Sequence, residues 1–309
     1  MKLSSLRVGQ LGLSLIFAAC GAAGGPNGGG ANLPSRGIGP WDKVEETPTL
    51  TPPTGTTWAN PSALNRTDGV DLYFEVQTTA GSEIAMAQTD ESGEMIGQAT
   101  TILADASQPA VTVGPDGKRW LAWVDADATM KVGTIDTDGQ VELVASPTFA
   151  GTSPVVVFNR EGTLHLFFVQ DGSVKVSRRN DEGGFPTPSL VLAPGVDCVD
   201  TKGEATPCWD ADEIIDIDVR LGNTAADRAV FRLFYTGKKG TVHAFGFAAS
   251  YNGRIWQRYA FNPVFSPGNG SRSPAAAISG GRYLMYYSDK SSKSLKLGAL
   301  EPVVLSETW

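Results

Sequence analysis

Histidine and cysteine are scarce in this sequence. Its 309 residues include two histidines, His165 and His243, and three cysteines. These few residues lack the ligand spacing of a zinc site. No Ser/His/Asp set with nucleophile-elbow spacing and no phosphate-binding loop is present either. We therefore expect no metal and no cofactor, and we expect both histidines to be structural.

Two Asp-rich stretches offer a weak alternative for a metal. Residues 125–127 and 136–139 resemble fragments of calcium loops but lack the Glu that should follow. Asp and Gly are also the residues that form tight turns. We predict that both stretches are turns.

Positive charge is also limited. The chain has 25 Lys and Arg against 33 Asp and Glu, a formal net charge of −8. Nucleic acids and anionic lipid surfaces select for basic proteins. The composition therefore argues against nucleic acid as a partner.

No segment shows a sustained helical period of apolar residues. From Trp58 onward the apolar residues come in short runs rich in β-branched and aromatic side chains, and Gly, Asp and Asn separate the runs. This pattern is typical of strands joined by turns. We predict an all-β domain over residues 58–309.

The N-terminus has the features of an export signal. Lys2 and Arg7 precede an apolar run from Leu11 to Ala19, which is shorter than the ~20 residues of a membrane-spanning helix. The following Phe17-Ala18-Ala19-Cys20 resembles the lipobox of bacterial lipoproteins, although Phe17 stands where that family usually has an aliphatic residue. Residues 1–19 are then a lipoprotein signal peptide and Cys20 carries acyl chains. The alternative is an ordinary signal peptide cleaved after Ala19.

Residues 20–57 are predicted to be a linker. Residues 21–30 are dominated by Gly, and residues 31–57 are rich in Pro, Thr and Gly. Such a stretch forms a flexible tether that docks loosely, if at all. Two or more acyl chains give a stable membrane anchor. We expect the lipid bilayer to be a partner through acylated Cys20, with the protein in the bacterial cell envelope, at the outer membrane or cell surface.

Cys198 and Cys208 remain as a pair. In an oxidising envelope compartment, two such cysteines indicate a disulfide. The loop between them is short, so the bond would stabilise the fold by ~3 kcal/mol or less. Metal binding is the disfavoured alternative.

Five segments after residue 58 share one plan. Each begins with a polar residue, usually before Pro, and continues with a short apolar strand, a turn usually containing Gly, an aromatic-rich strand and a third strand. The segments start at residues 60, 108, 153, 216 and 273. These intervals match four-stranded propeller blades, with insertions in the longer ones. We predict a five-bladed β-propeller; a β-sandwich is the alternative.

The last two repeats resemble a known group of enzymes. Residues 249–256 with 262–264, residues 273–288, and Trp209-Asp210 with Asp216 are similar to blade motifs of glycoside hydrolase families 43, 32 and 130. Asn252 and Ile217 replace the usual Asp and Pro. The resemblance is clear over residues 209–300 and supports the propeller fold.

The same resemblance argues against ordinary catalysis. Glycosidic hydrolysis needs two carboxyl groups, which in these families occupy the blade starts just before Pro. The corresponding residues here include one carboxylate: Asn60, Gln108, Ser153, Asp216 and Ser273. Asp210, Asp212 or Glu213 would supply a second acid only if their loop folds into the central funnel. We therefore expect a non-catalytic module; the alternatives are a glycosidase with a rearranged acid pair and a purely structural envelope protein.

Four residues form the predicted ligand site: Trp209, Asp210, Asp216 and Arg272. Asp216 is the catalytic candidate if any activity exists, and it either contacts a ligand or forms an ion pair with an arginine such as Arg272. Trp209 either stacks on a sugar ring or packs on the disulfide. The expected ligand is a carbohydrate or an envelope protein.

Overall fold

The computed structural model describes residues 41–43, 50–195, 198–199, 205–206, 208–223, 229–259 and 262–300. All of them belong to one compact unit that spans residues 33–309. The predicted signal peptide and Cys20 lie outside the described residues. Within the described ranges, the regular elements are β-strands and none is a helix.

A membrane-crossing helix, long and apolar enough to span a bilayer, is not found in the described part of the chain.

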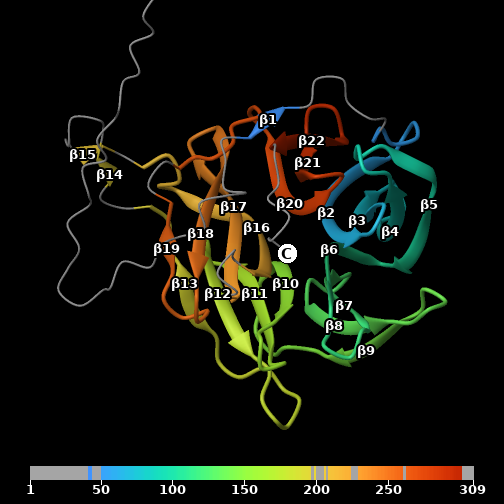
Figure 1. Ribbon diagram of the computed structural model, residues 1–309, viewed down its shortest axis with the longest axis horizontal. Coiled ribbons are helices and arrows are strands. Elements are labelled where there is room, and N and C mark those ends of the chain that lie inside the picture. The colour runs from blue at the N-terminus through green and yellow to red at the C-terminus, as the bar shows by residue number, and fades with distance from the viewer. Residues whose placement is uncertain are drawn as a thin grey trace, which may run out of the picture. The chain divides into compact units, whose positions relative to one another are not determined.

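Five antiparallel sheets of four strands form the fold (Figure 1). The first is β2 (Thr57–Arg66), β3 (Gly69–Gln77), β4 (Ser82–Thr89) and β5 (Met95–Ala104). The second is β6 (Ala106–Val113), β7 (Arg119–Asp125), β8 (Met130–Ile135) and β9 (Val141–Ala145). The third is β10 (Thr152–Phe158), β11 (Leu164–Gln170), β12 (Ser173–Arg178) and β13 (Ser189–Leu192).

The last two sheets follow the same order. The fourth is β16 (Glu213–Asn223), β17 (Ala229–Lys239), β18 (Val242–Ser250) and β19 (Gln257–Arg258). The fifth is β20 (Ser271–Ser279), β21 (Arg282–Asp289), β22 (Ser294–Leu300) and, from the start of the chain, β1 (Asp42–Lys43).

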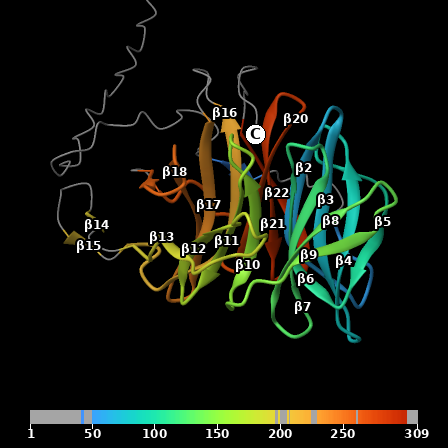
Figure 2. The same ribbon diagram turned by 90° about the horizontal axis from the view of Figure 1, so that it is seen from below.

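The five sheets close into a ring. Each first strand contacts the first strands of its neighbours in the order β2, β6, β10, β16 and β20, and β20 in turn contacts β2. Figure 1 shows these strands around a common centre, and Figure 2 shows the blades from the side. The predicted five-bladed β-propeller is confirmed, and the sandwich alternative is wrong.

The aromatic-rich second strands form the core. Each lies inside its sheet and is covered on both faces by neighbouring blades, so nearly every side chain along β3, β11 and β21 is buried. Strands covered on both faces are mostly apolar and show no regular alternation with polar residues. This explains why the second strands carry paired aromatic residues such as Phe167-Phe168 and Tyr286-Tyr287.

Part of the predicted linker belongs to the propeller. β1 pairs with β22, so that Asp42 lies opposite Ala299 and completes the fifth blade. Trp41 and Leu50 are buried against the ring. The prediction of a loosely docked linker up to residue 57 is therefore wrong at these positions, because the first strand of the chain closes the last sheet.

The loop with the predicted disulfide carries a small ribbon. β14 (Cys198–Val199) pairs with β15 (Ala205–Thr206), and Cys198 lies opposite Thr206. Cys208 is buried, two residues beyond that pair. The side chain of Cys198 lies outside the described residues, so the bond between the two cysteines remains a prediction.

The two Asp-rich stretches are turns, as predicted. The Asp125 carboxylate accepts hydrogen bonds from the backbone N–H groups of Asp127 and Thr129. Asp136 binds the N–H groups of Asp138 and Gln140 in the same way. These carboxylates thus hold hairpin turns between strands.

Candidate functional site

The polar residues before Pro occupy a special backbone conformation. In four blades a β-bulge interrupts the pairing of the first two strands at this position. The polar residue there has a φ in the left-handed region, which few non-glycine residues adopt. These residues are Asn60 (48°), Gln108 (52°), Ser153 (49°) and Ser273 (56°). The bulge is tolerated because the following Pro has no N–H to offer the sheet.

The fourth blade departs from this plan. Its register shift lies between Ile214 and Asp216, and Asp216 is paired directly with Thr236. Ile217 stands where the other blades have Pro, and its backbone N–H donates to Oγ of Ser153 at 3.0 Å. A proline could not make this bond, which gives a physical reason for the departure from the family pattern.

Hydrogen bonds join the blade starts to each other around the axis. Oγ of Ser273 donates to Oδ1 of Asn60 at 2.7 Å, and Nδ2 of Asn60 donates to Oε2 of Glu75 at 2.6 Å. The Gln108 N–H donates to the same carboxylate at 3.2 Å. The Ser153 N–H then donates to Oε1 of Gln108 at 2.5 Å. We call this level of the axis the narrow end.

The narrow end leaves little free space. Its axial cavity is lined by residues from the first strands of all five blades and measures about 20 Å³. A volume of this size suits a single water molecule. A sugar therefore has no room within this part of the axis.

Glu75 holds the narrow end together and was missed by the sequence analysis. It lies on β3, is 4 % exposed, and accepts four hydrogen bonds, from Asn60, Gln77, Ser82 and Gln108. The signal in the sequence is a second carboxylate, after Asp71, within a mostly apolar strand. All four donors are neutral, so this carboxylate is satisfied by hydrogen bonds and by no ion pair among the described residues.

Asp216 and Arg272 lie together, as one of the two interpretations of Asp216 requires. Nε of Arg272 is 2.9 Å from Oδ2 of Asp216, and Asp216 is 7 % exposed. Asp216 is absent from the residues that line the narrow axial cavity. A role of this pair in binding a ligand stays a prediction.

Trp209 and Asp210 form a separate cluster. The Trp209 ring stacks on Tyr235 with centroids 5.6 Å apart. A Cβ atom on Gly237 or Gly246 would lie 2.6 or 2.7 Å from this ring, so only glycine fits beneath it. Asp210 is almost fully buried and accepts a hydrogen bond from the Tyr235 hydroxyl at 3.1 Å.

The burial of this cluster changes its acid–base properties. Burial raises the pKa of the Tyr235 hydroxyl, and the nearby Asp210 carboxylate raises it further. Arg258 lies 3.3 Å from Asp210 and compensates its charge. Within the described chain no hydrogen bond or ion pair connects this cluster to Asp216 or Arg272, so the predicted site divides into two pairs.

The other acids of this loop turn toward a hairpin. Asp212 accepts a hydrogen bond from the Gly240 N–H at 2.6 Å, and Glu213 forms an ion pair with Lys238 at 2.5 Å. Neither lines the axial cavity, whereas Asp218 does. Asp218 accepts a hydrogen bond from the Ala276 N–H at 2.8 Å and lies 2.9 Å from Nε of Arg220.

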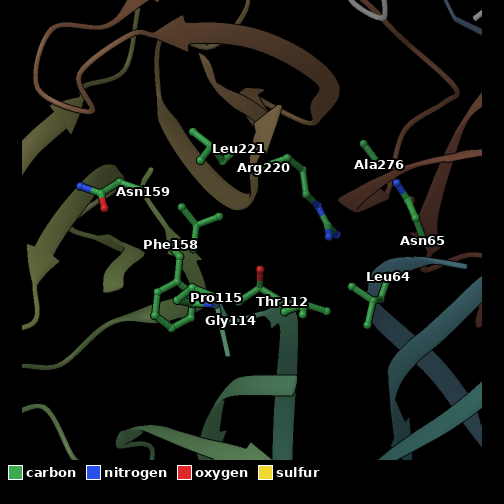
Figure 3. A pocket seen from close by; sticks show the side chains of 12 residues that line it. Leu64, Asn65, Thr112, Gly114, Pro115, Phe158, Asn159, Arg220, Leu221 and Ala276 are labelled. Atoms are coloured by element: carbon green, nitrogen blue, oxygen red, sulfur yellow. The ribbon is translucent and has the colours of Figure 1, made fainter. Parts of the chain in front are cut away.

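The opposite end of the axis is wider. There the later residues of all five first strands surround a cavity of about 410 Å³ (Figure 3). The Arg220 side chain extends into this space, between Asn65 and Thr112. A second cavity of about 560 Å³ adjoins it and shares Asn159 and Leu221 as lining residues. We call this region the wide end.

Comparisons with known proteins place the fold. No family model matches the chain. No curated protein matches it in sequence either.

Solved structures do match. A glycosyl hydrolase from Bacteroides ovatus superposes with a TM-score of 0.60 at 12% identity, covering 87% of this chain and 94% of that one. A structure described under the GH130 family, in which glycoside hydrolases target β-1,2 mannosidic linkages in Candida mannan, has a TM-score of 0.65 at 12% identity, covering 88% and 97%. The catalytic domain of the Coprinopsis cinerea GH62 α-L-arabinofuranosidase has a TM-score of 0.58 at 15% identity, covering 86% and 98%.

At these identities the similarity establishes the architecture alone. The chain is a five-bladed β-propeller of the kind found in glycoside hydrolases.

Proposed function

We propose that this protein is a membrane-anchored lipoprotein whose propeller binds a carbohydrate or a protein partner in the bacterial cell envelope without catalysing a reaction. One observation carries the proposal. The blade-start side chains, where the related enzymes hold their acids, are here mostly neutral and hydrogen bonded to each other or to Glu75.

The one blade-start carboxylate is already engaged. Asp216 is paired with Arg272 and is nearly buried. A general acid must exchange a proton with the leaving oxygen, and a second carboxylate must activate water or attack. Asp216 lies outside the axial cavity and is paired with Arg272. Asp218, which lines that cavity, is paired with Arg220. Two carboxylates that are each held by an arginine support binding over hydrolysis.

Incubation of the purified full chain with a panel of aryl glycosides tests this proposal. We expect no turnover above the uncatalysed rate. Turnover that Asp216→Asn abolishes, while Asp212→Asn leaves it unchanged, would contradict the proposal. It would favour the alternative function, a glycosidase with a rearranged acid pair, for which the enzymatic neighbours are the supporting observation.

The proposal of a lipid anchor is based on the sequence. Lys2, Arg7, the short apolar run and Cys20 support export and acylation. Expression in a bacterial host with radiolabelled palmitate should label the wild-type chain and place it in the membrane fraction. Cys20→Ser should lose the label and the membrane association, and an equally labelled Cys20→Ser chain would exclude this site of acylation.

A further inference from the structure

The wide end of the axis concentrates arginines in an otherwise acidic chain. Three arginines and one glutamate line the larger cavity: Arg160, Arg178, Arg254 and Glu161. Arg220 lines the adjoining cavity. The whole chain has an excess of acids, so this local excess of positive charge runs against the composition. We call the two joined cavities the arginine groove.

Two of these arginines, Arg178 and Arg254, line the same cavity and repel each other. Among the described residues, neither Arg178 nor Arg254 forms an ion pair with an Asp or Glu. Burial lowers the pKa of Arg178, and the charge of Arg254 lowers it further. Two guanidinium groups that repel each other beside a cavity are stabilised when an anion enters between them.

A third arginine offers a free donor at the other end of the groove. Arg220 uses Nε to bind Asp218 at 2.9 Å. Its Nη2 atom is buried and has no hydrogen-bond partner within the described part of the chain. A buried donor without a partner costs free energy that a ligand acceptor recovers. In Figure 3 this side chain extends into the cavity.

The remaining lining is amphipathic. Asn65, Thr112 and Asn159 offer amide and hydroxyl groups, while Pro115, Phe158 and Leu221 offer apolar surface. Tyr251 and Asn252 add an exposed aromatic ring and an amide beside Arg254. Saccharides present hydroxyl groups at their edges and apolar C–H faces, and a lining of this kind suits both.

We propose that the arginine groove binds an acidic oligosaccharide, with its carboxylate or phosphate groups held by Arg178, Arg254 and Arg220. The inference rests on the proposed binding function and specifies the site and the ligand class. It places the ligand at the wide end of the axis. At the narrow end the blade-start side chains already form hydrogen bonds with one another or with Glu75.

The test is calorimetric titration of the purified full chain with trigalacturonate as the carboxylate-bearing probe. We expect saturable binding that weakens at least about tenfold between about 0.05 M and about 0.5 M NaCl, because the contacts are ionic. The Arg178→Gln/Arg254→Gln variant should weaken binding by at least about tenfold, since it removes two charge-assisted contacts. Inorganic phosphate should compete with trigalacturonate, because the same guanidinium groups bind both kinds of anion.

A matched control removes the same charge elsewhere. Lys290 and Lys296 belong to the fifth blade and line neither cavity. The Lys290→Gln/Lys296→Gln variant should therefore bind trigalacturonate as the wild type does. Equal affinity of the wild type and the arginine variant would overturn the inference. So would tighter binding of hexaglutamate than of trigalacturonate, which would indicate an acidic peptide.

Titration with neutral maltotriose distinguishes failure of this inference from failure of the proposed function. Binding of maltotriose that both double variants retain, together with no binding of trigalacturonate, would overturn the acidic ligand and leave the binding function standing. Turnover of aryl glycosides would instead contradict the binding function itself.

Discussion

The two ends of the propeller axis are built from the same five strands and differ in what their side chains do. At the narrow end, Asn60, Gln108, Ser153 and Ser273 hydrogen-bond to each other or to Glu75, and about 20 Å³ is left between them. At the wide end, a cavity of about 410 Å³ contains an arginine whose outer nitrogen has no described partner. Polar groups that satisfy each other stabilise a fold, and polar groups left unsatisfied beside a cavity are available to a ligand.

On our proposal, the difference also distinguishes this chain from a glycosidase of the same fold. In the enzyme families that the sequence resembles, the blade starts carry the reacting acids. Here four of the five blade-start side chains are hydrogen bonded to each other or to Glu75, and we propose that the ligand binds at the other end. Propellers permit this change because each blade contributes side chains to both ends of the axis.

The largest expected effect is at Glu75. Glu75→Ala removes the acceptor for four described donors, and leaving several partly buried donors unpaired should lower the free energy of unfolding by about 3 kcal/mol. Urea denaturation measures this change in the free energy of unfolding. Glu83→Ala, on the next strand, removes one acceptor near the surface and should cost less than about 1 kcal/mol. Equal losses for both variants would show that the narrow end is not held by Glu75.

A smaller effect is expected at Asp216. Asp216→Asn removes a mostly buried ion pair with Arg272 and should lower the free energy of unfolding by about 1–2 kcal/mol. A double-mutant cycle with Arg272→Gln should then give a coupling energy of about 1 kcal/mol. A coupling near zero would mean that the two side chains act independently and that Asp216 is available for another role.

The pH dependence of stability should differ between the two histidines. Burial lowers the pKa of His165 in the folded chain, and the charge of Arg178 at the wide end lowers it further. The folded state thus prefers neutral His165, so stability is lost as the pH falls through about 6.5, the unfolded value. His165→Gln should flatten the fall in unfolding free energy between pH 7 and pH 5.

His243 is the internal comparison. Burial lowers its pKa as well, followed by Arg272 and two lysines, but its side chain is only partly buried. His243→Gln should therefore flatten the pH profile less than His165→Gln does. The reverse order would contradict the assignment of the acid-sensitive group to His165.

The smallest expected change in stability is at the arginine groove. Arg178→Gln and Arg254→Gln remove charges that repel each other and break no described ion pair. Each should alter the free energy of unfolding by less than about 0.5 kcal/mol, and Arg178→Gln should raise the pKa of His165 in an NMR titration. A loss of unfolding free energy comparable to that of Glu75→Ala would show that these arginines stabilise the fold and are not available to a ligand.

The propeller was predictable because each repeat can be recognised from the types of a few residues that are close together in the sequence. A polar residue before Pro marks four blade starts, and paired aromatic residues mark the second strands, so five segments aligned without a structure. The strand β1 was missed because Asp42 and Lys43 carry no β pattern, and their place depends on β22 at the other end of the chain.

The candidate site was less predictable. The ion pair between Asp216 and Arg272 was one of the two interpretations of Asp216. It could be anticipated because Asp216 begins the fourth repeat and Arg272 directly precedes the fifth. Glu75 and the arginine groove were missed because their members come from different blades and meet only in the folded ring. In the sequence Arg160, Arg178, Arg220 and Arg254 are unremarkable surface charges.

Hydrogen exchange with and without trigalacturonate tests most directly whether the wide end is the binding end. We expect slower exchange of backbone amides in residues 157–161, 176–178, 220–222 and 251–254, with little change at residues 59–62, 107–110 and 215–218. Slower exchange confined to the blade starts would contradict this expectation and would place the ligand at the narrow end.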